Sequence, residues 1–416
     1  MLSLPTLNNI LDTLKPSDII PSNDKLDILE MVGDLITQYL DIEGISFHYE
    51  NFHETLYKSI HKEAYLQIKD LYSEDIFSEL SCIVNKAISI YFTYIISKRS
   101  YSTDIVKYKP NIGIISKKLD YLTNIPQPAQ RTKEWYEFRH HHLTASSIWK
   151  AFSTQSHINN LIYNKCIPLD VNKYSSVNVD SPLHWGQKYE DLSILWYEYT
   201  YKTKVRDFGC IKHKDIEFIA ASPDGINVDE KSDRYGRMLE VKNIVNREIT
   251  KIPKFEYWIQ MQVQLEVCDL NECDFLETRF KEYDNYDGFY NDGSFNYTKE
   301  GKYKGVVIMF INKDSLPVYE YPPWNISLDE FNIWNNKILE KHKHNTWLRN
   351  IYWYLDEVSV VLVPRNKFWF SKAKPILEDF WNTLSLEKKN GFQHRLPKKR
   401  AKLNNLPVQP KCLINL

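Results

Sequence analysis

The chain has 416 residues, 43% of them hydrophobic, which is enough to bury one large core or two to three smaller ones. Its 53 basic and 54 acidic residues leave a formal net charge of -1, so overall charge predicts no polyanionic partner and any nucleic-acid contact must be local. With 14% aromatic residues and only 12 glycines, the composition is typical of a packed globular protein and excludes a disordered or fibrous one.

Secretion and membrane insertion are not expected either. The most apolar stretch, Ala87 to Ser97, is too short to span a bilayer. The six cysteines form no C-x-x-C pair, and the N-terminus has an early acid and no long apolar run. We therefore expect a soluble intracellular protein that is not secreted, with reduced thiols and no membrane partner.

The first part of the chain, residues 1–125, is predicted to be a helical accessory domain. Apolar residues recur at helical spacing between Leu26 and Leu40, and the pattern returns over residues 74–98. No residue pattern in this part of the chain indicates a catalytic or binding site. Two prolines in NIPQPAQRT, residues 124–132, predict a linker that ends this domain.

A mixed pattern follows over residues 126–321. Helices are expected at 134–152, 183–201 and 254–267, and strands at 206–213, 216–222, 237–245, 273–280 and 305–312. Helices that alternate with a block of strands predict an α/β (α+β) domain.

The last part of the chain is predicted to be a helical and aromatic extension, residues 322–387, and then a basic tail, residues 388–416. Ser327 and Glu330 form the pattern of a capping box that opens a helix. The aromatic residues of 347–370 favour core packing, with stacking on unpaired bases as the alternative. The tail, with seven Lys or Arg and no acid between residues 388 and 403, is typical of a solvated segment, a DNA contact or a nuclear address.

Two acids and a lysine are expected to converge at one end of a predicted hairpin. In Pro223-Asp224-Gly225 the proline fixes φ and the glycine permits a tight reversal, so Asp224 is held at a strand end. Glu240 and Lys242 are two apart on the next strand and share a face. Two close carboxylates favour a hard divalent cation such as Mg²⁺, and a nearby lysine can orient a water for phosphodiester hydrolysis. Glu-x-Lys recurs elsewhere, so the motif alone is also consistent with a surface ion pair.

Three other segments add candidate groups. Glu190, four residues after Gly186 on a predicted helix, could supply a third carboxylate. Arg139 lies seven residues before Ser146, about two turns of the predicted helix 134–152, and this pair could hold a terminal phosphate. The helix over 254–267 carries Gln260, Gln262 and Gln264 beside Tyr257, a polar face that suits a nucleic-acid backbone or a metal-bound water. His140, His141 and His142 are expected to be solvated or to face DNA, because three consecutive histidines on a helix point in different directions.

These motifs, in this order, resemble the phage lambda exonuclease family, also called the YqaJ viral recombinase family, of the PD-(D/E)XK nuclease superfamily. The order is W-x-x-x-R with T-A-S, G-x-x-x-E, S-P-D-G, L-E-V-K and Y-x-x-Q-x-Q, over roughly residues 131–312. The resemblance implies a restriction-endonuclease-like core with a central mixed β-sheet flanked by helices. It also implies a magnesium-dependent exonuclease that digests double-stranded DNA from the 5′ end, releases mononucleotides and serves recombination or repair.

The resemblance also implies roles for individual residues. The metal, Mg²⁺ with Mn²⁺ as a possible substitute, would be bound by Asp224, Glu240, Glu190 and the carbonyl of Val241. Lys242 would activate water and Gln260 would orient it, while the 5′-phosphate or DNA would be held by Arg139, Ser146, Thr144, Tyr257 and Gln262. Implied partners are double-stranded DNA, a single-strand annealing protein and further copies of the chain in a trimer, in a large-DNA-virus setting: host cytoplasm, viral factory or nucleus.

Two alternatives remain open from the residues. A structure-specific or nicking endonuclease could use the same fold, because fold does not determine which substrate enters. A catalytically retired DNA-binding scaffold belongs to a different class of protein, and the intact acids and lysine argue against it.

Overall fold

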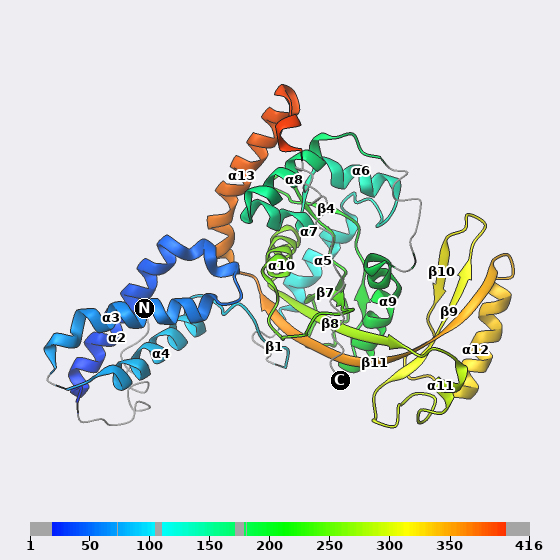
Figure 1. The fold of residues 1–416 in the computed structure, drawn as a ribbon, viewed down its shortest axis with the longest axis horizontal. Helices are drawn as coiled ribbons and strands as arrows, with labels where there is room; N and C mark the ends of the chain where they lie inside the picture. The colour runs from blue at the N-terminus through cyan, green and yellow to red at the C-terminus, as the bar shows by residue number, and fades with distance from the viewer. Residues whose placement is uncertain (1–18, 73, 105–109, 171–178, 180, 397–416) are drawn as a thin grey trace, which may run out of the picture.

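The computed structural model describes residues 19–72, 74–104, 110–170, 179 and 181–396 (Figure 1). Its first part is helical, as the sequence predicts, with α2 (Ser22–Glu43), α3 (Phe52–Ile68) and α4 (Phe77–Tyr94) packed against one another. The buried side chains of α2 recur at helical spacing, which is why this helix forms and where it packs: Ile28, Leu29, Val32, Ile36 and Leu40. None of the described helices is both long and apolar enough to cross a membrane.

A central sheet of eight strands crosses the rest of the molecule. Its order is β10-β9-β11-β8-β7-β6-β3, with β1 paired to β11. The strands are β1 (Tyr101–Ser102), β3 (Val205–Arg206), β6 (Gly225–Asn227), β7 (Met238–Asn243), β8 (Glu272–Glu282), β9 (Lys304–Ile311), β10 (Pro317–Glu320) and β11 (Thr346–Pro364). Because β7 and β8 run parallel and the other pairs antiparallel, the sheet is mixed, as expected.

A smaller sheet, in the order β2-β5-β4, packs against α10. It consists of β2 (Leu143–Thr144), β4 (Ile211–Lys212) and β5 (Ile219–Ala221). The helices of this region are α5 (Ile112–Asn124), α6 (Lys133–His141), α7 (Ala145–Ile148), α8 (Gln155–Cys166), α9 (Pro182–Tyr201) and α10 (Phe255–Cys268). The remaining helices are α11 (Tyr286–Tyr290), α12 (Leu328–Lys341) and α13 (Lys367–Asn390). Short 3-10 turns cover 44–48, 69–71, 149–152 and 393–395.

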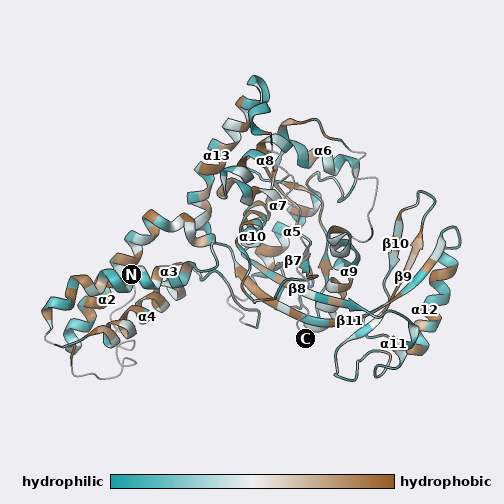
Figure 2. Ribbon diagram, in the orientation of Figure 1, coloured by the Kyte–Doolittle hydropathy of each residue, from teal (hydrophilic) through white to brown (hydrophobic). Residues whose placement is uncertain are grey.

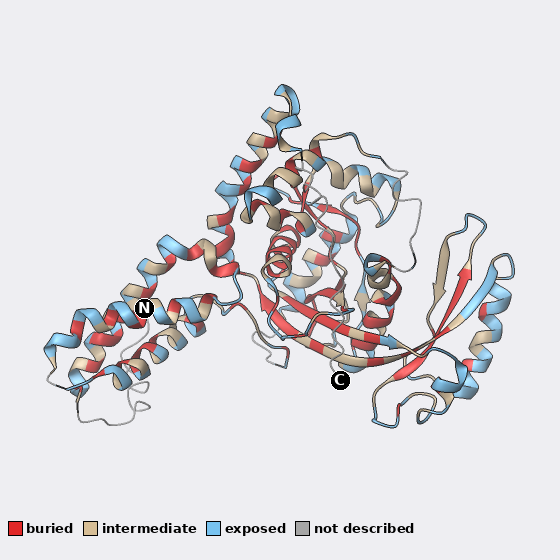
Figure 3. Cartoon of the chain, viewed as in Figure 1, coloured by how far each residue is buried: buried red, intermediate tan, exposed pale blue. Residues whose placement is uncertain are grey.

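Helices α9 and α10 cover opposite faces of strand β7, and this sandwich sets the side-chain directions in the strand. Leu239 and Val241 pack with α9, whereas Met238 belongs to the core around α10. Glu240 and Lys242 follow Met238 at a period of two, so they also face α10. Figure 3 shows α10 as almost entirely buried, and Figure 2 shows apolar and polar residues mixed along β8 and β11.

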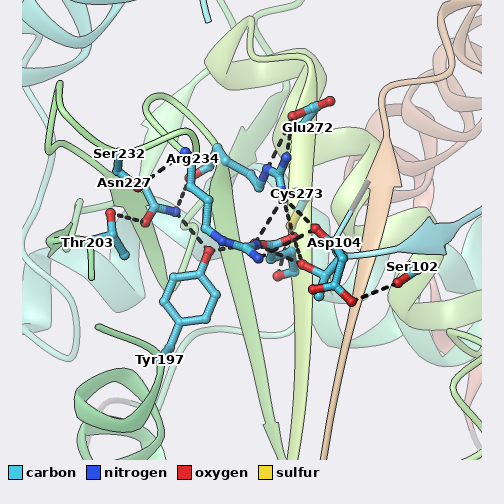
Figure 4. A network of polar contacts seen from close by, with 12 residues as sticks. Ser102, Asp104, Tyr197, Thr203, Asn227, Ser232, Arg234, Glu272 and Cys273 are labelled. Carbon is cyan, nitrogen blue, oxygen red and sulfur yellow. Dashed lines mark hydrogen bonds and ion pairs between the residues drawn. The ribbon is translucent and has the colours of Figure 1, made fainter. Parts of the chain in front are cut away.

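A buried polar network fastens the segment after β1 to the central sheet (Figure 4). Asp274 on β8 has no exposed surface and accepts hydrogen bonds from Thr103 (3.0 Å), Tyr197 (2.5 Å) and Arg237 (3.1 Å), and it also pairs with Arg234. A buried carboxylate is stable only when it is paired and fully hydrogen-bonded. The network therefore joins the connection from the N-terminal helices to strands β7 and β8.

Three expectations about local structure are wrong. The predicted helix over 134–152 is interrupted by β2, and the predicted strand over 206–213 is two short strands in different sheets. The predicted helical extension contains β11, which lies between β8 and β9 in the middle of the sheet. The sheet therefore extends past residue 321, where the sequence predicted the core to end.

Other expectations about the C-terminal part are confirmed. The capping box of Ser327 and Glu330 opens α12. In the aromatic segment, Trp353 and Trp369 are buried, in agreement with core packing, whereas Trp347 is exposed. The predicted tail lies outside the described residues from 397 onward.

Candidate active site

The site begins at the hairpin formed by β6 and β7. Gly225 pairs with Leu239, and a Cβ on Gly225 would lie 2.2 Å from Cγ1 of Val205, so glycine lets β3 pack against this hairpin. The turn before it places the carboxylate of Asp224 against β7, where Oδ2 accepts a hydrogen bond from the backbone N–H of Val241 at 2.8 Å. Asp224 therefore contacts the strand that carries Glu240, as expected.

Glu240 is the centre of the site and has no exposed surface. Its Oε1 accepts hydrogen bonds from the Lys242 ammonium and from Nε2 of Gln260, the latter at 2.6 Å. Its Oε2 accepts a hydrogen bond from Nε2 of Gln264 at 2.7 Å. Gln260 and Gln264 are four residues apart on α10 and so share the face toward β7.

Electrostatic interactions link the acids of this hairpin. Burial, reinforced by the negative charges of Glu240 and Glu190, raises the pKa of Asp224 well above its usual range. Burial opposes the charge on Lys242, but the carboxylates of Glu240 and Asp224 outweigh that effect and raise the pKa of Lys242. The lysine is thus a cation held among carboxylates, in the position from which it could face a phosphate.

Tyr257 and Arg247 complete the lysine's surroundings. The Lys242 ammonium lies 5.1 Å from the centre of the Tyr257 ring, and the Arg247 guanidinium lies 5.4 Å from it. Arg247 also pairs with Glu277 on β8. Tyr257 was expected here from the sequence, whereas Arg247, which follows β7 with no motif to mark it, was not.

Glu190 lies on α9 near these groups, as expected, but it has a partner of its own. Its Oε2 is 2.9 Å from Nη2 of Arg131, a residue that no sequence motif marks. Burial, with the charges of Asp191 and Glu240, raises the pKa of Glu190, and Arg131 opposes that rise.

Arg139 and Ser146 meet as predicted, although not on one helix. Nη2 of Arg139 donates to Oγ of Ser146 at 2.8 Å, from α6 to α7 across strand β2. The guanidinium lies 4.1 Å from the Trp135 ring, whose Nε1 donates to Oγ of Ser222 at 3.2 Å. Because β2 runs parallel to β5, both strands end at the same edge of the small sheet. Strand β2 leads to Ser146, and β5 leads directly to Ser222 and Asp224. The pair therefore lies on the same side as the acids.

Two other candidates are directed elsewhere. Both polar atoms of the Gln262 side chain are used at the start of α13: Nε2 donates to Pro364 O (3.0 Å), and Oε1 accepts from Asn366 N (2.6 Å). Gln262 lies two residues from Gln260 and so projects from the other side of α10. Thr144 is 3% exposed and its hydroxyl bonds to that of Ser147 at 3.1 Å. The expectation that Gln262 and Thr144 contact DNA is not supported by these positions.

The three consecutive histidines do not act as one cluster. His142 stacks on Phe138 with ring centres 4.2 Å apart, and its Nδ1 is 2.7 Å from the carbonyl of Phe138. His140 and His141 meet edge to face. Burial and neighbouring positive charges lower the pKa of His140 to about 4, so its imidazole is neutral at physiological pH.

The donor set of the hairpin suits a hard divalent cation. In the part of the chain that the structure describes, no three His, Cys, Asp or Glu side chains converge closely enough to hold an ion by themselves. The Asp224 carboxylate is hydrogen-bonded to Val241, the residue next to Glu240, and two carboxylates with a backbone carbonyl and waters are a usual Mg²⁺ set. Asp224 and Glu240 could therefore bind such an ion together. Glu190 lies beside them and is paired with Arg131.

Comparisons with known proteins agree with the sequence resemblance. Residues 134–271 match the sequence family described as YqaJ-like viral recombinase domain. The chain is also 29% identical over 334 residues to an uncharacterised protein, R354, of Acanthamoeba polyphaga mimivirus. That match covers 71% of this chain and 59% of the relative, so the chain spans less than two thirds of that protein.

Among solved structures, the alkaline exonuclease of Laribacter hongkongensis matches with a TM-score of 0.37 and 16% identity. The match covers 62% of this chain and 95% of that enzyme, and the same enzyme in complex with dAMP gives the same values.

Proposed function

We propose that this protein is a divalent-metal-dependent DNA nuclease, and specifically an exonuclease that digests double-stranded DNA from the 5′ end during recombination or repair. The observation that carries the proposal is the hairpin of Asp224, Glu240 and Lys242, in which a fully buried glutamate is gripped by a lysine and two amides. Such a costly buried arrangement of charges is typical of a functional site. The YqaJ-like domain covers these residues.

In this proposal the chain's own residues divide the work. Mg²⁺, or Mn²⁺ in its place, would be held by Asp224, Glu240 and the carbonyl of Val241, and would lower the pKa of a bound water and neutralise charge at phosphorus. Lys242 would orient the attacking water and stabilise charge that develops on the phosphate, and Gln260 would hold the carboxylate and water in register. Tyr257 limits the directions open to the lysine, since the ammonium lies over its ring.

The 5′ polarity rests on the Arg139–Ser146 pair. An arginine beside a hydroxyl, on the same side of the fold as the acids, can bind a terminal phosphate through charge-assisted hydrogen bonds. A phosphate held there would place the first phosphodiester near the hairpin. Glu190 would act beside the two metal ligands, with Arg131 favouring its ionised form.

The test is digestion of linear duplex DNA, 5′-phosphorylated or 5′-hydroxyl, with Mg²⁺, beside a closed circular duplex. We expect wild-type protein to release mononucleotides from linear DNA, faster from the phosphorylated end, and to leave the circle intact. Lys242→Ala should slow this by about 10²-fold or more, the usual range for a group that assists proton transfer. The control is Lys214→Ala, at a largely exposed lysine.

Other outcomes point to the alternatives. Cutting of the circle would favour a nicking or structure-specific endonuclease. Binding of DNA without any cutting, unchanged by Asp224→Ala, would favour the retired scaffold. The trimer and the annealing partner remain predictions, which molecular mass in solution and co-purification would check.

A further inference from the structure

We propose that Gln264 is a positioning residue of the metal site, which holds Glu240 in a fixed relation to the turn that carries Asp224. This inference rests on the proposed function and gives a specific role to Gln264, which the sequence placed on the polar face of this helix and which the motif Y-x-x-Q-x-Q does not include. Gln264 has no exposed surface. Its Nε2 donates two hydrogen bonds, one to Oε2 of Glu240 at 2.7 Å and one to the carbonyl of Ser222 at 3.1 Å.

The two acceptors belong to different segments of the site. Glu240 lies in the middle of β7, and Ser222 lies two residues before Asp224, directly after β5. These strands belong to different sheets. The Gln264 amide is thus a direct bridge between the segments that carry the two proposed metal ligands.

The orientation of this amide is determined by its surroundings. Reversing it would place Oε1 against two acceptors, the Glu240 carboxylate and the Ser222 carbonyl, which is repulsive. In the observed orientation Oε1 is buried and has no hydrogen-bond partner within the described structure. Leaving such a group unpaired costs about 1–3 kcal/mol. A methionine would fill a similar volume without that cost. The two donated hydrogen bonds, and not the packing, therefore account for a glutamine at this position.

The neighbouring glutamines show that this role is specific to one position. Gln260 donates to the other oxygen of Glu240, and no bond from it to the Asp224 turn is observed. Gln262 is bonded to Pro364 and Asn366, away from the site. Of these three glutamines, Gln264 is the one whose side chain joins the Glu240 carboxylate to the turn that carries Asp224. Residues that orient metal ligands in this way typically change metal affinity by 10- to 100-fold when mutated.

The test compares Mn²⁺ binding by the full-length protein, measured by calorimetry without DNA, in wild type, Gln264→Met and Gln262→Met. Gln262 is the matched control, since it is equally buried on the same helix and also makes two hydrogen bonds. We expect Gln264→Met to bind Mn²⁺ 10- to 100-fold more weakly. Gln262→Met should keep the wild-type affinity while its melting temperature falls.

The outcomes separate this inference from the proposed function. Wild-type affinity in Gln264→Met, or equal loss in Gln262→Met, would overturn the positioning role alone. Mn²⁺ binding that is absent in wild type or unchanged by Asp224→Asn would overturn the proposed metal site, and this inference with it. If Gln264→Met does not fold by circular dichroism, Gln264→Asn replaces it, since its amide is one methylene shorter and cannot reach both acceptors.

Discussion

Asp224 shows how a single proposed ligand affects the whole protein's stability. Burial and the nearby Glu240 and Glu190 charges raise its pKa, so the folded protein holds this proton more tightly than the unfolded chain does. Its stabilising contribution is therefore complete below the unfolded pKa, about 4, and is lost as pH rises through the higher folded pKa. At alkaline pH without metal, the ionised carboxylate destabilises the fold.

We therefore predict that Asp224→Asn is more stable than wild type in chelator at pH 8. The gain should be about 0.5–2 kcal/mol, the usual range for a single stabilising substitution, and it should shrink as pH falls. Mg²⁺ should raise the melting temperature of wild type and not that of the variant. Thermal unfolding at several pH values measures both effects, with Asp233→Asn, at an exposed carboxyl, as the control. A variant that is less stable than wild type in chelator would contradict the argument.

The helices and strands that the sequence predicts well are those determined by residues close together in the chain. The alternation over 237–245 gives β7 and its two faces correctly, because a strand packed between two helices repeats with a period of two. The capping box also predicts the start of α12 correctly, because its two partners lie within one helical turn. The Asp224–Glu240 approach followed from a turn and a strand that are adjacent in the chain.

The parts that were missed depend on contacts between distant segments. The predicted helix 134–152 breaks because the N–H of Leu143 donates to the carbonyl of Phe218, 2.7 Å away, and β2 joins β5. The alternating pattern that would predict strand β11 is interrupted by two register shifts. It is also broken by the charged residues Asp356 and Glu357, whose partners lie on or beside neighbouring strands. Its run of aromatic and β-branched residues was the available signal.

Helix α6 joins the proposed phosphate pair to the proposed metal site through one side chain. The Trp135 ring lies under the Arg139 guanidinium, and its Nε1 donates to Ser222, which in turn accepts from Gln264 through its carbonyl. A phenylalanine would keep the ring beneath the guanidinium and lose only the hydrogen bond. The helix would then keep its packing and lose its direct tie to the Asp224 turn.

We predict that Trp135→Phe reduces the preference for 5′-phosphorylated over 5′-hydroxyl ends by about 3- to 10-fold. That loss corresponds to one hydrogen bond of about 0.5–1.5 kcal/mol. The measurement is the ratio of kcat/KM for the two duplexes, and the rate on hydroxyl ends should change little. Trp347→Phe, at an exposed tryptophan at the start of β11, is the control. A preference equal to wild type would show that the hydrogen bond does not help to place Arg139.

The N-terminal helices are attached to α10, the helix that carries Gln260 and Gln264. Arg99 is 3% exposed and donates to the carbonyls of His48 (2.8 Å) and Pro253 (2.6 Å), the latter just before α10. The Trp258 indole of α10 donates to the carbonyl of Arg99 at 2.9 Å, and its ring lies 5.6 Å from that of Phe47. The helices therefore support the side of α10 that faces away from Glu240.

This attachment predicts that the N-terminal helices and the nuclease core unfold together. Arg99→Met leaves the two carbonyls without their buried donor, which should cost about 3–5 kcal/mol because the lost bonds are charge-assisted and inside the protein. We expect thermal unfolding of wild type in one transition at the same midpoint by circular dichroism and by tryptophan fluorescence. In Arg99→Met the transition should shift to lower temperature.

Hydrogen exchange in the folded protein separates this coupling from a local defect. In Arg99→Met, backbone amides of α2 and α3 and those of α10 should all exchange faster, since the guanidinium joins the turn between α2 and α3 to the segment before α10. Lys98→Met is the matched control, because Lys98 is the adjacent residue and is exposed. Faster exchange confined to α2, α3 and α4, with α10 unchanged and Mn²⁺ affinity intact, would instead show that the N-terminal helices are a separable domain. In that case the proposed site would depend on the central sheet, α9 and α10 alone.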